Sequence, residues 1–158
     1  MAGEDKNVII AYDGSPNAEY ALDWYVKNVY RPGKHVVLFH VPEIHVITQT
    51  SSWTSPVTMD PRTVAALLQE EQNRVQNDLE IFADKLRSLS IGGKVKSVAA
   101  SKPGEAIVEE ANESHAELVV AGTRGLGKIR RTLVGSVSDY LVHHCNCPVL
   151  VVKIPKNQ

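Results

Sequence analysis

Residues 118–138, LVVAGTRGLGKIRRTLVGSVS, decide the fold of this chain. Their first four residues are an unbroken apolar run, which is typical of a strand buried on both faces of a parallel sheet. A glycine-rich segment follows, and a helical pattern then runs from about Gly135 to His144. Glycine allows the backbone to approach a ligand closely, and a helix N-terminus attracts anions. The stretch therefore predicts a strand, an anion-binding loop and a helix in succession.

Four further runs rich in β-branched residues lie at 8–12, 36–41, 94–99 and 149–152. Helical patterns separate them, and this alternation indicates repeated βαβ units with right-handed crossovers. Most of the runs are continuously apolar, so we expect a mainly parallel sheet that helices cover on both faces. Only residues 94–99 alternate between polar and apolar side chains, which places that strand at an exposed edge.

Proline in the first turn marks the start of three predicted helices. Ser15 and Asp60 each precede such a proline as N-cap candidates, and Ser101-Lys102-Pro103 opens the third helix. The second helix is the longest, and its apolar residues from Leu68 to Leu89 form one stripe at helical spacing. Residues 44–59, which precede it, are rich in Ser and Thr. We expect a surface loop there, with a lid or a partner-docking segment as the alternative.

The composition is that of an ordinary globular chain: 158 residues, of which 43% are hydrophobic and 22% are charged. We expect a single domain over residues 1–158, with short flexible ends at 1–6 and 155–158. The net charge of -1 argues against a nucleic-acid or membrane-surface partner. No signal peptide or membrane span is recognisable, and Cys145 and Cys147 are too few for a disulfide framework. A cytoplasmic protein is therefore expected.

Positive charge gathers beside the glycines. The window 118–138 contains no acidic residue and has four basic ones, Arg124, Lys128, Arg130 and Arg131. Successive amides in a glycine-rich loop can form an anion-binding nest, so a phosphate site is predicted here. Ser136 and Ser138 start the next helix, where their hydroxyls can bind phosphate oxygens or cap the helix. Asp13, which follows the first strand, either accepts a hydrogen bond from a ribose hydroxyl or an exocyclic amine, or forms an Asx-turn.

The spacing of the polar residues argues against three other kinds of site. Residues 122–128 meet the glycine and lysine spacing of a P-loop, but Ile129 stands where Ser or Thr would hold Mg²⁺. The first strand is followed by Asp13-Gly14-Ser15-Pro16 rather than by a dinucleotide fingerprint. The histidines and cysteines of residues 143–147 do not match structural zinc spacing. We therefore expect no P-loop NTPase, no NAD-dependent chemistry and no metal ligated by the protein itself.

These residues resemble those of the universal stress protein family. The family pattern is Gly, two residues, Gly, nine residues, and Gly followed by Ser or Thr, and Gly122, Gly125 and Gly135-Ser136 meet it. Three further blocks agree with the family: VIIAYDGS at 8–15, LFHV at 38–41 and CPVLVV at 147–152. The resemblance covers essentially the whole chain. It implies a Rossmann-like α/β fold with an open, five-stranded parallel sheet in the order 3-2-1-4-5 and a nucleotide pocket beside strands one and four.

The resemblance also implies which residues contact an adenine nucleotide, ATP or AMP. By position, Ala11 and Asp13 meet the ribose or adenine, and Val41 contacts the adenine ring. The residues implied around the ribose and phosphates are Gly122, Arg124, Gly125, Gly135, Ser136, Val137 and Ser138. Lys128 lies in the variable nine-residue stretch, and its phosphate contact is an electrostatic inference. Any Mg²⁺ is expected to come with the nucleotide.

The last strand indicates how the chain assembles. In the implied order this strand is an edge, and its residues, Val149, Leu150, Val151 and Val152, are apolar and uncharged. An open edge of this kind has unpaired backbone groups and tends to associate with other strands. Two copies of the chain could pair their last strands across a two-fold axis and so cover this edge. The resemblance likewise implies a homodimer through this strand.

The function that these features favour is a stress-response protein whose bound adenine nucleotide sets its conformation or its choice of protein partner. No general base is identifiable near the glycines, so we assign no catalytic residue and expect at most weak ATP hydrolysis. Two alternatives stay open. One is a slow ATPase or a phosphoryl or adenylyl transferase on the same scaffold, and the other is a dimeric interaction module whose pocket takes no ligand.

Overall fold

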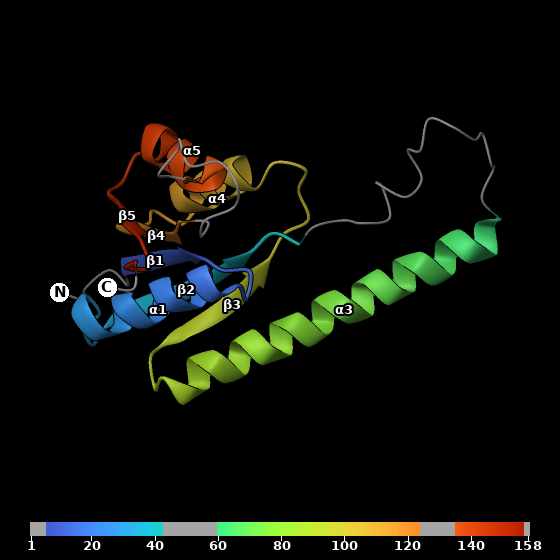
Figure 1. Cartoon of the computed structure of the whole chain (residues 1–158), viewed down its shortest axis with the longest axis horizontal. Helices are drawn as coiled ribbons and strands as arrows, with labels where there is room; N and C mark the ends of the chain where they lie inside the picture. The colour runs from blue at the N-terminus through green and yellow to red at the C-terminus, as the bar shows by residue number, and fades with distance from the viewer. Residues whose placement is uncertain (1–5, 43–59, 124–134, 157–158) are drawn as a thin grey trace.

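The computed structural model describes residues 6–42, 60–123 and 135–156. Strands and helices alternate along these residues: β1 (Lys6–Ala11), α1 (Pro16–Asn28), β2 (Lys34–His40), α3 (Pro61–Ser88), β3 (Gly93–Ser97), α4 (Pro103–Glu113), β4 (Leu118–Gly122), α5 (Ser136–His144) and β5 (Val149–Val152). The strands form one parallel sheet in the order β3-β2-β1-β4-β5 (Figure 1). The predicted fold class and strand order are confirmed. The predicted loop 44–59 lies outside the described residues.

The two faces of the sheet are covered by different helix pairs. Side chains alternate along a strand, so Ile10 and Leu38 pack against α1 and α3, whereas Ile9 and Phe39 pack against α4 and α5. These four side chains are at most 2% exposed. Burial on both faces explains why the central strands are continuous apolar runs in the sequence.

The order in which the chain adds strands to the sheet reverses between β1 and β4. From β1 the chain builds outward to β2 and β3, and then it crosses to the other side of β1 for β4 and β5. Ile10 therefore pairs with Leu38 on one side and with Val120 on the other. Connections that diverge in this way leave a crevice outside the carboxyl ends of the two strands. The segments that follow β1 and β4 are thus brought to one edge of the sheet.

The local signals at the helix starts are those expected from the sequence. Ser15 accepts a hydrogen bond from the Ala18 N–H at 3.3 Å, and Asp60 accepts one from the Arg62 N–H at 3.1 Å. Each cap precedes a proline in the first turn, where a missing N–H is harmless. α4 also starts with its proline, but its N-cap residue Lys102 makes no side-chain capping hydrogen bond.

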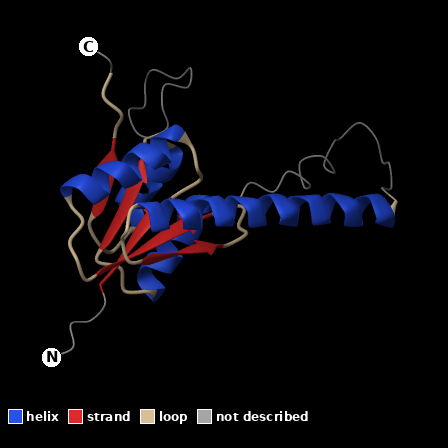
Figure 2. Ribbon diagram, turned by 90° about the horizontal axis from the view of Figure 1, so that it is seen from below, coloured by secondary structure: helices blue, strands red, loops and turns tan. Residues whose placement is uncertain are grey.

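The apolar stripe along the longest helix is buried only in its second half. Phe82 and Leu86 are buried near the end of α3, but Leu68 is 48% exposed. The reason is length: 28 residues give a helix of about 42 Å, whereas strands of five to seven residues span only about 17 to 23 Å. The first half of α3 accordingly extends beyond the sheet (Figures 1 and 2).

The two edges of the sheet are β3 and β5. The edge position of β3 confirms the prediction made from its alternating side chains, and α3 packs nearby on one face. At the other edge, Val149, Leu150 and Val151 are half-buried within one chain, and Val152 is buried. None of the helices in the described ranges is long and apolar enough to cross a bilayer.

Phe82 holds α3 on the domain, and its removal should destabilise the fold. Its ring packs edge-on against Tyr12, with 4.8 Å between the ring centroids, and it is 4% exposed. We expect Phe82→Ala to lower the free energy of unfolding by about 3 to 5 kcal/mol, because it leaves a cavity in the core. Chemical denaturation followed by circular dichroism measures this change.

The neighbouring Ile81→Ala variant is the matched control. Ile81 precedes Phe82 on the same turn but is 62% exposed, so its truncation should change the free energy of unfolding by less than about 0.5 kcal/mol. Equal effects of the two substitutions would contradict the assignment of Phe82 as the contact that anchors the helix.

Candidate functional site

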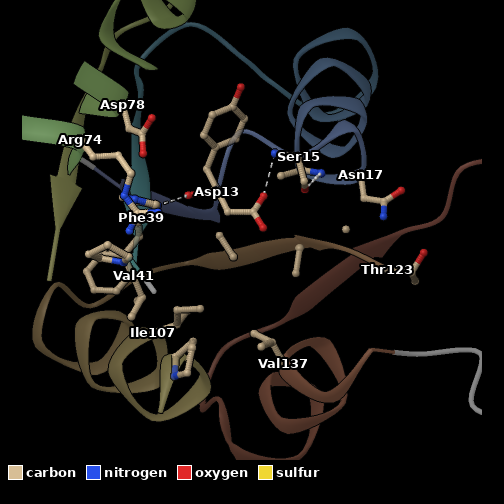
Figure 3. A pocket seen from close by; sticks show the side chains of 18 residues that line it. Asp13, Ser15, Asn17, Phe39, Val41, Arg74, Asp78, Ile107, Thr123 and Val137 are labelled. Atoms are coloured by element: carbon tan, nitrogen blue, oxygen red, sulfur yellow. Dashed lines mark hydrogen bonds between the residues drawn. The ribbon is translucent and has the colours of Figure 1, made fainter. Parts of the chain in front are cut away.

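A cavity of about 300 Å³ opens at the carboxyl edge of the sheet. Its walls come from the ends of β1, β2 and β4, from the first turns of α1, α4 and α5, and from the middle of α3 (Figure 3). The volume is at the lower end of the range for small-molecule pockets. Because this edge is also the place where the strand order reverses, the cavity has the position at which open α/β sheets bind ligands.

The turn after β1 presents Asp13 to this cavity. The carboxylate of Asp13 accepts a hydrogen bond from the Ser15 N–H at 2.9 Å, which is the Asx-turn considered from the sequence. Asp13 nevertheless remains exposed and lines the cavity, so it retains lone pairs that can accept a further hydrogen bond. The two interpretations of Asp13 are therefore compatible.

Glycine is required in this turn for two reasons. Gly14 has a φ of +76°, which other residues rarely adopt, and a Cβ atom there would lie 2.9 Å from Cε1 of Phe82. The close approach allows α3 to pack directly on the turn that carries Asp13.

A buried imidazole forms part of the cavity wall beside this turn. The Nδ1 atom of His40 lies 3.2 Å from the carbonyl oxygen of Tyr12, and a carbonyl only accepts, so Nδ1 carries the proton. His40 is 5% exposed, and its Nε2 has no hydrogen-bond partner among the described residues. Burial raises the pKa of the Tyr12 phenol above its ordinary value, and the nearby Glu19 carboxylate adds to the effect.

The end of β4 is packed tightly against the start of α1. A Cβ atom on Gly122 would lie 2.6 Å from the carbonyl oxygen of Asn17, so only glycine permits this approach. The next residue, Thr123, is buried, and its N–H donates to the Val152 carbonyl at 3.1 Å. Gly122 thus has a packing role in addition to lining the cavity.

The N-terminus of α5 has no side-chain cap. Gly135 is the N-cap residue and the first helical hydrogen bond runs from the Asp139 N–H to the Gly135 carbonyl at 2.9 Å. The amides of Ser136, Val137 and Ser138 precede that bond and point out of the helix end, where an anion can accept from them.

The hypothesis that Ser136 or Ser138 caps the helix is wrong. Ser138 is 2% exposed, and its hydroxyl donates to the Gly135 carbonyl at 3.0 Å instead of accepting from a first-turn amide. The Ser138 side chain therefore bonds back to the first turn of its own helix, and the first-turn backbone amides stay available to an anion.

The structure gathers part of the predicted site in one place. The predicted residues that line the cavity are Ala11, Asp13, Val41, Gly122 and Val137. Those at the start of α5 that do not line it directly are Gly135, Ser136 and Ser138. The remaining predicted residues, Arg124, Gly125 and Lys128, lie outside the described residues. Nucleotide contact by any of these residues stays a prediction.

The cavity also has lining residues that the sequence did not indicate. Arg74 and Asp78 extend from α3 on one side of the cavity, and Ile107 of α4 forms an apolar wall on another side (Figure 3). The available signal was the spacing of Arg74, Asp78 and Phe82, which places them on one face of a helix. That spacing does not tell which part of the sheet the face meets.

In the histidine and cysteine run of residues 143–147, His143 and His144 end α5, and Cys145 and Cys147 lie in the connection from α5 to β5. Within the described ranges, no group of three or more His, Cys, Asp or Glu side chains is placed to hold a metal ion. Cys145 and Cys147 are free thiols, and burial raises the pKa of Cys145 to about 11. The Cys145 thiol is therefore protonated near neutral pH and is a poor nucleophile.

Comparison with known proteins gives a consistent result. Residues 5–153 match the Universal stress protein family. Universal stress protein PHOS34 from Arabidopsis thaliana is 32% identical over 169 residues, a match that includes 99% of this chain and 65% of that protein. The chain thus spans less than two thirds of the length of this relative.

Two similar solved structures contain adenine nucleotides. One is a universal stress protein family protein from Arabidopsis thaliana with AMP bound, at a TM-score of 0.66 and 20% identity over 95% of this chain and 92% of that chain. The other is a universal stress protein in complex with cAMP, at a TM-score of 0.56 and 20% identity over 95% of this chain and 98% of that chain. At this level of identity the two structures show a shared fold.

Proposed function

Because the chain belongs to the universal stress protein family, we propose that it binds an adenine nucleotide in the cavity at the carboxyl ends of β1, β2 and β4. Similar folds with AMP and cAMP bound support this class of ligand. The observation that carries the proposal is the polarity of the cavity, which has an apolar wall at one end and an uncapped helix N-terminus at the other.

The apolar wall suits a purine base. Val41 at the end of β2 and Ile107 on α4 are side chains that can pack against the face of a planar ring. Asp13 lies in the turn after β1, between these residues and the β4 end of the cavity, where a carboxylate can accept from a ribose hydroxyl. A nucleoside can therefore occupy the cavity with its base toward β2.

The opposite end suits phosphate. The first-turn amides of α5 lack a side-chain cap, and the helix dipole favours an anion in front of them. We expect Arg124, Gly125 and Lys128 to add amides and positive charge to this end. ATP or AMP fits this arrangement, with Mg²⁺ held by the phosphates of ATP and by water.

We further propose that the nucleotide acts as a ligand that sets the conformation of the protein or its choice of partner. This role requires binding and release but no general base, and we assign none. ATP turnover well above background with a defined acceptor would instead identify a transferase. The two free thiols suit a reducing, cytoplasmic compartment.

We also propose a homodimer through β5. Among the described elements, β5 pairs with β4 on one side only, and its four residues carry no charge that would deter another strand. Such an edge is normally covered or paired. A second copy can pair with it across a two-fold axis.

Mass spectrometry of the purified protein tests the nucleotide proposal. Denaturation should release AMP or ATP that has been carried through purification, and calorimetry should then show that the stripped protein binds the same compound. Protein that releases no nucleotide and shows no heat of binding with ATP, AMP or cAMP would leave only a module without a ligand.

Placing a negative charge at the start of α5 should weaken phosphate binding without harming the fold. In Ser136→Asp the carboxylate favours the helix dipole but repels a phosphate at the first-turn amides. We expect the affinity for AMP to fall about tenfold or more, whereas the affinity for adenosine, which has no phosphate, stays unchanged. Ser136→Asn is the neutral control of matching size. Equal AMP affinity in the Asp and Asn variants would place the phosphate elsewhere.

Charging the edge strand should separate the dimer. Val151→Lys puts an ammonium group on the strand that two copies would share, and light scattering should then report the mass of a monomer. Ile81→Lys adds the same charge to an exposed position on α3, which packs near the opposite edge of the sheet, and this control should remain dimeric. A wild-type monomer, or a dimer that persists in Val151→Lys, contradicts the proposed interface.

A further inference from the structure

α3 forms one wall of the cavity, and Phe82 holds the helix in place by packing in the core. Phe82 packs against Tyr12 and also edge-on against His40, with 5.2 Å between the ring centroids. Asp78 precedes Phe82 by one helical turn and therefore lies on the same face of the helix. Asp78 lines the cavity beside the end of β2 (Figure 3). The contact that holds the helix in place thus also positions this carboxylate.

Asp78 differs from the other charged side chains that line the cavity in the described part of the chain. The Asp13 carboxylate already accepts the Ser15 N–H, and Arg74 pairs with Glu71 at 2.5 Å. Asp78 is half-buried and has no hydrogen bond or ion pair with any described residue. A carboxylate that has lost part of its hydration needs a donor to replace it. A ligand in the cavity can provide that donor.

The charge of Asp78 limits which part of a nucleotide can lie next to it. A carboxylate repels phosphate, and it offers only acceptors to a neutral group. The phosphates are attracted to the α5 N-terminus, at another wall of the cavity, and the ribose is placed next to Asp13, so the base is the part left for Asp78. Adenine carries an N–H donor at its edge in the 6-amino group, whereas its ring nitrogens only accept.

We infer that Asp78 accepts a hydrogen bond from the 6-amino group of the bound adenine nucleotide and makes the site selective for that group. The inference rests on the proposed function, because it assigns a specificity residue to the same cavity. Val41 and Ile107 can hold the ring by contact with its face, which any purine offers. The carboxylate on α3 distinguishes one purine from another by the groups at the edge of the ring.

The test compares AMP with purine riboside 5′-monophosphate, which lacks only the 6-amino group. Calorimetry on the wild-type protein should give an affinity for AMP that is about tenfold or more above the affinity for the analogue, which corresponds to the contribution of one hydrogen bond to a charged group. Asp78→Ala should lose this preference by weakening AMP binding alone. Asp78→Asn should keep part of it, because the amide oxygen still accepts. If Asp78 only supported the structure, Asp78→Ala would lower the affinities for both ligands equally and would leave the preference for AMP intact.

Asp84→Ala is the matched control. Asp84 lies on α3 outside the cavity, pairs with Arg87 and has a side chain that is 71% exposed, so both affinities should equal those of the wild type. If the wild type prefers AMP and Asp78→Ala keeps the full preference, the assignment of Asp78 is overturned while the proposed function stands. If the wild type binds neither nucleotide, the proposed function falls and the assignment falls with it.

Discussion

The arrangement of the site depends on the packing of Phe82 against the turn that follows β1. This ring contacts Tyr12 and His40, and it comes so close to Gly14 that a side chain there would collide with it. The contact fixes a long helix on the end of a sheet that is much shorter than the helix. It also determines which helical face borders the cavity, so the stability of the fold and the shape of the site rest on one cluster.

The sheet could be predicted because burial on both faces restricts which residue types a strand can contain. A strand segment that is buried on both faces is apolar, as are Val8–Ile10 of β1, Val36–Phe39 of β2 and Val119–Ala121 of β4. The path of α3 could not be predicted in the same way. Its apolar positions continue toward Leu68 at helical spacing, but no sheet lies beneath them, and sequence spacing carries no information about where the partner surface ends.

The residues of the site likewise fall into some that the sequence could predict and others that it could not. Asp13, Val41 and Gly122 follow strands directly, and parallel strands bring their carboxyl ends together, so the sequence was sufficient to place them at one edge. Arg74 and Asp78 reach the cavity through tertiary packing of a distant helix and give no local sign of it. Ser138 shows a further limit: a hydroxyl near a helix start can face either way, and here it turns back to the Gly135 carbonyl.

The overhang of α3 has a consequence for how the protein can vary. Local stability follows local packing, so the turns around Phe82 are tied to the global unfolding of the domain, whereas the turns near Leu68 can open separately. Substitutions in these outer turns alter the surface that the helix presents while the sheet and the cavity remain intact. The first half of α3 is therefore a region in which new surfaces can evolve at little expense to folding.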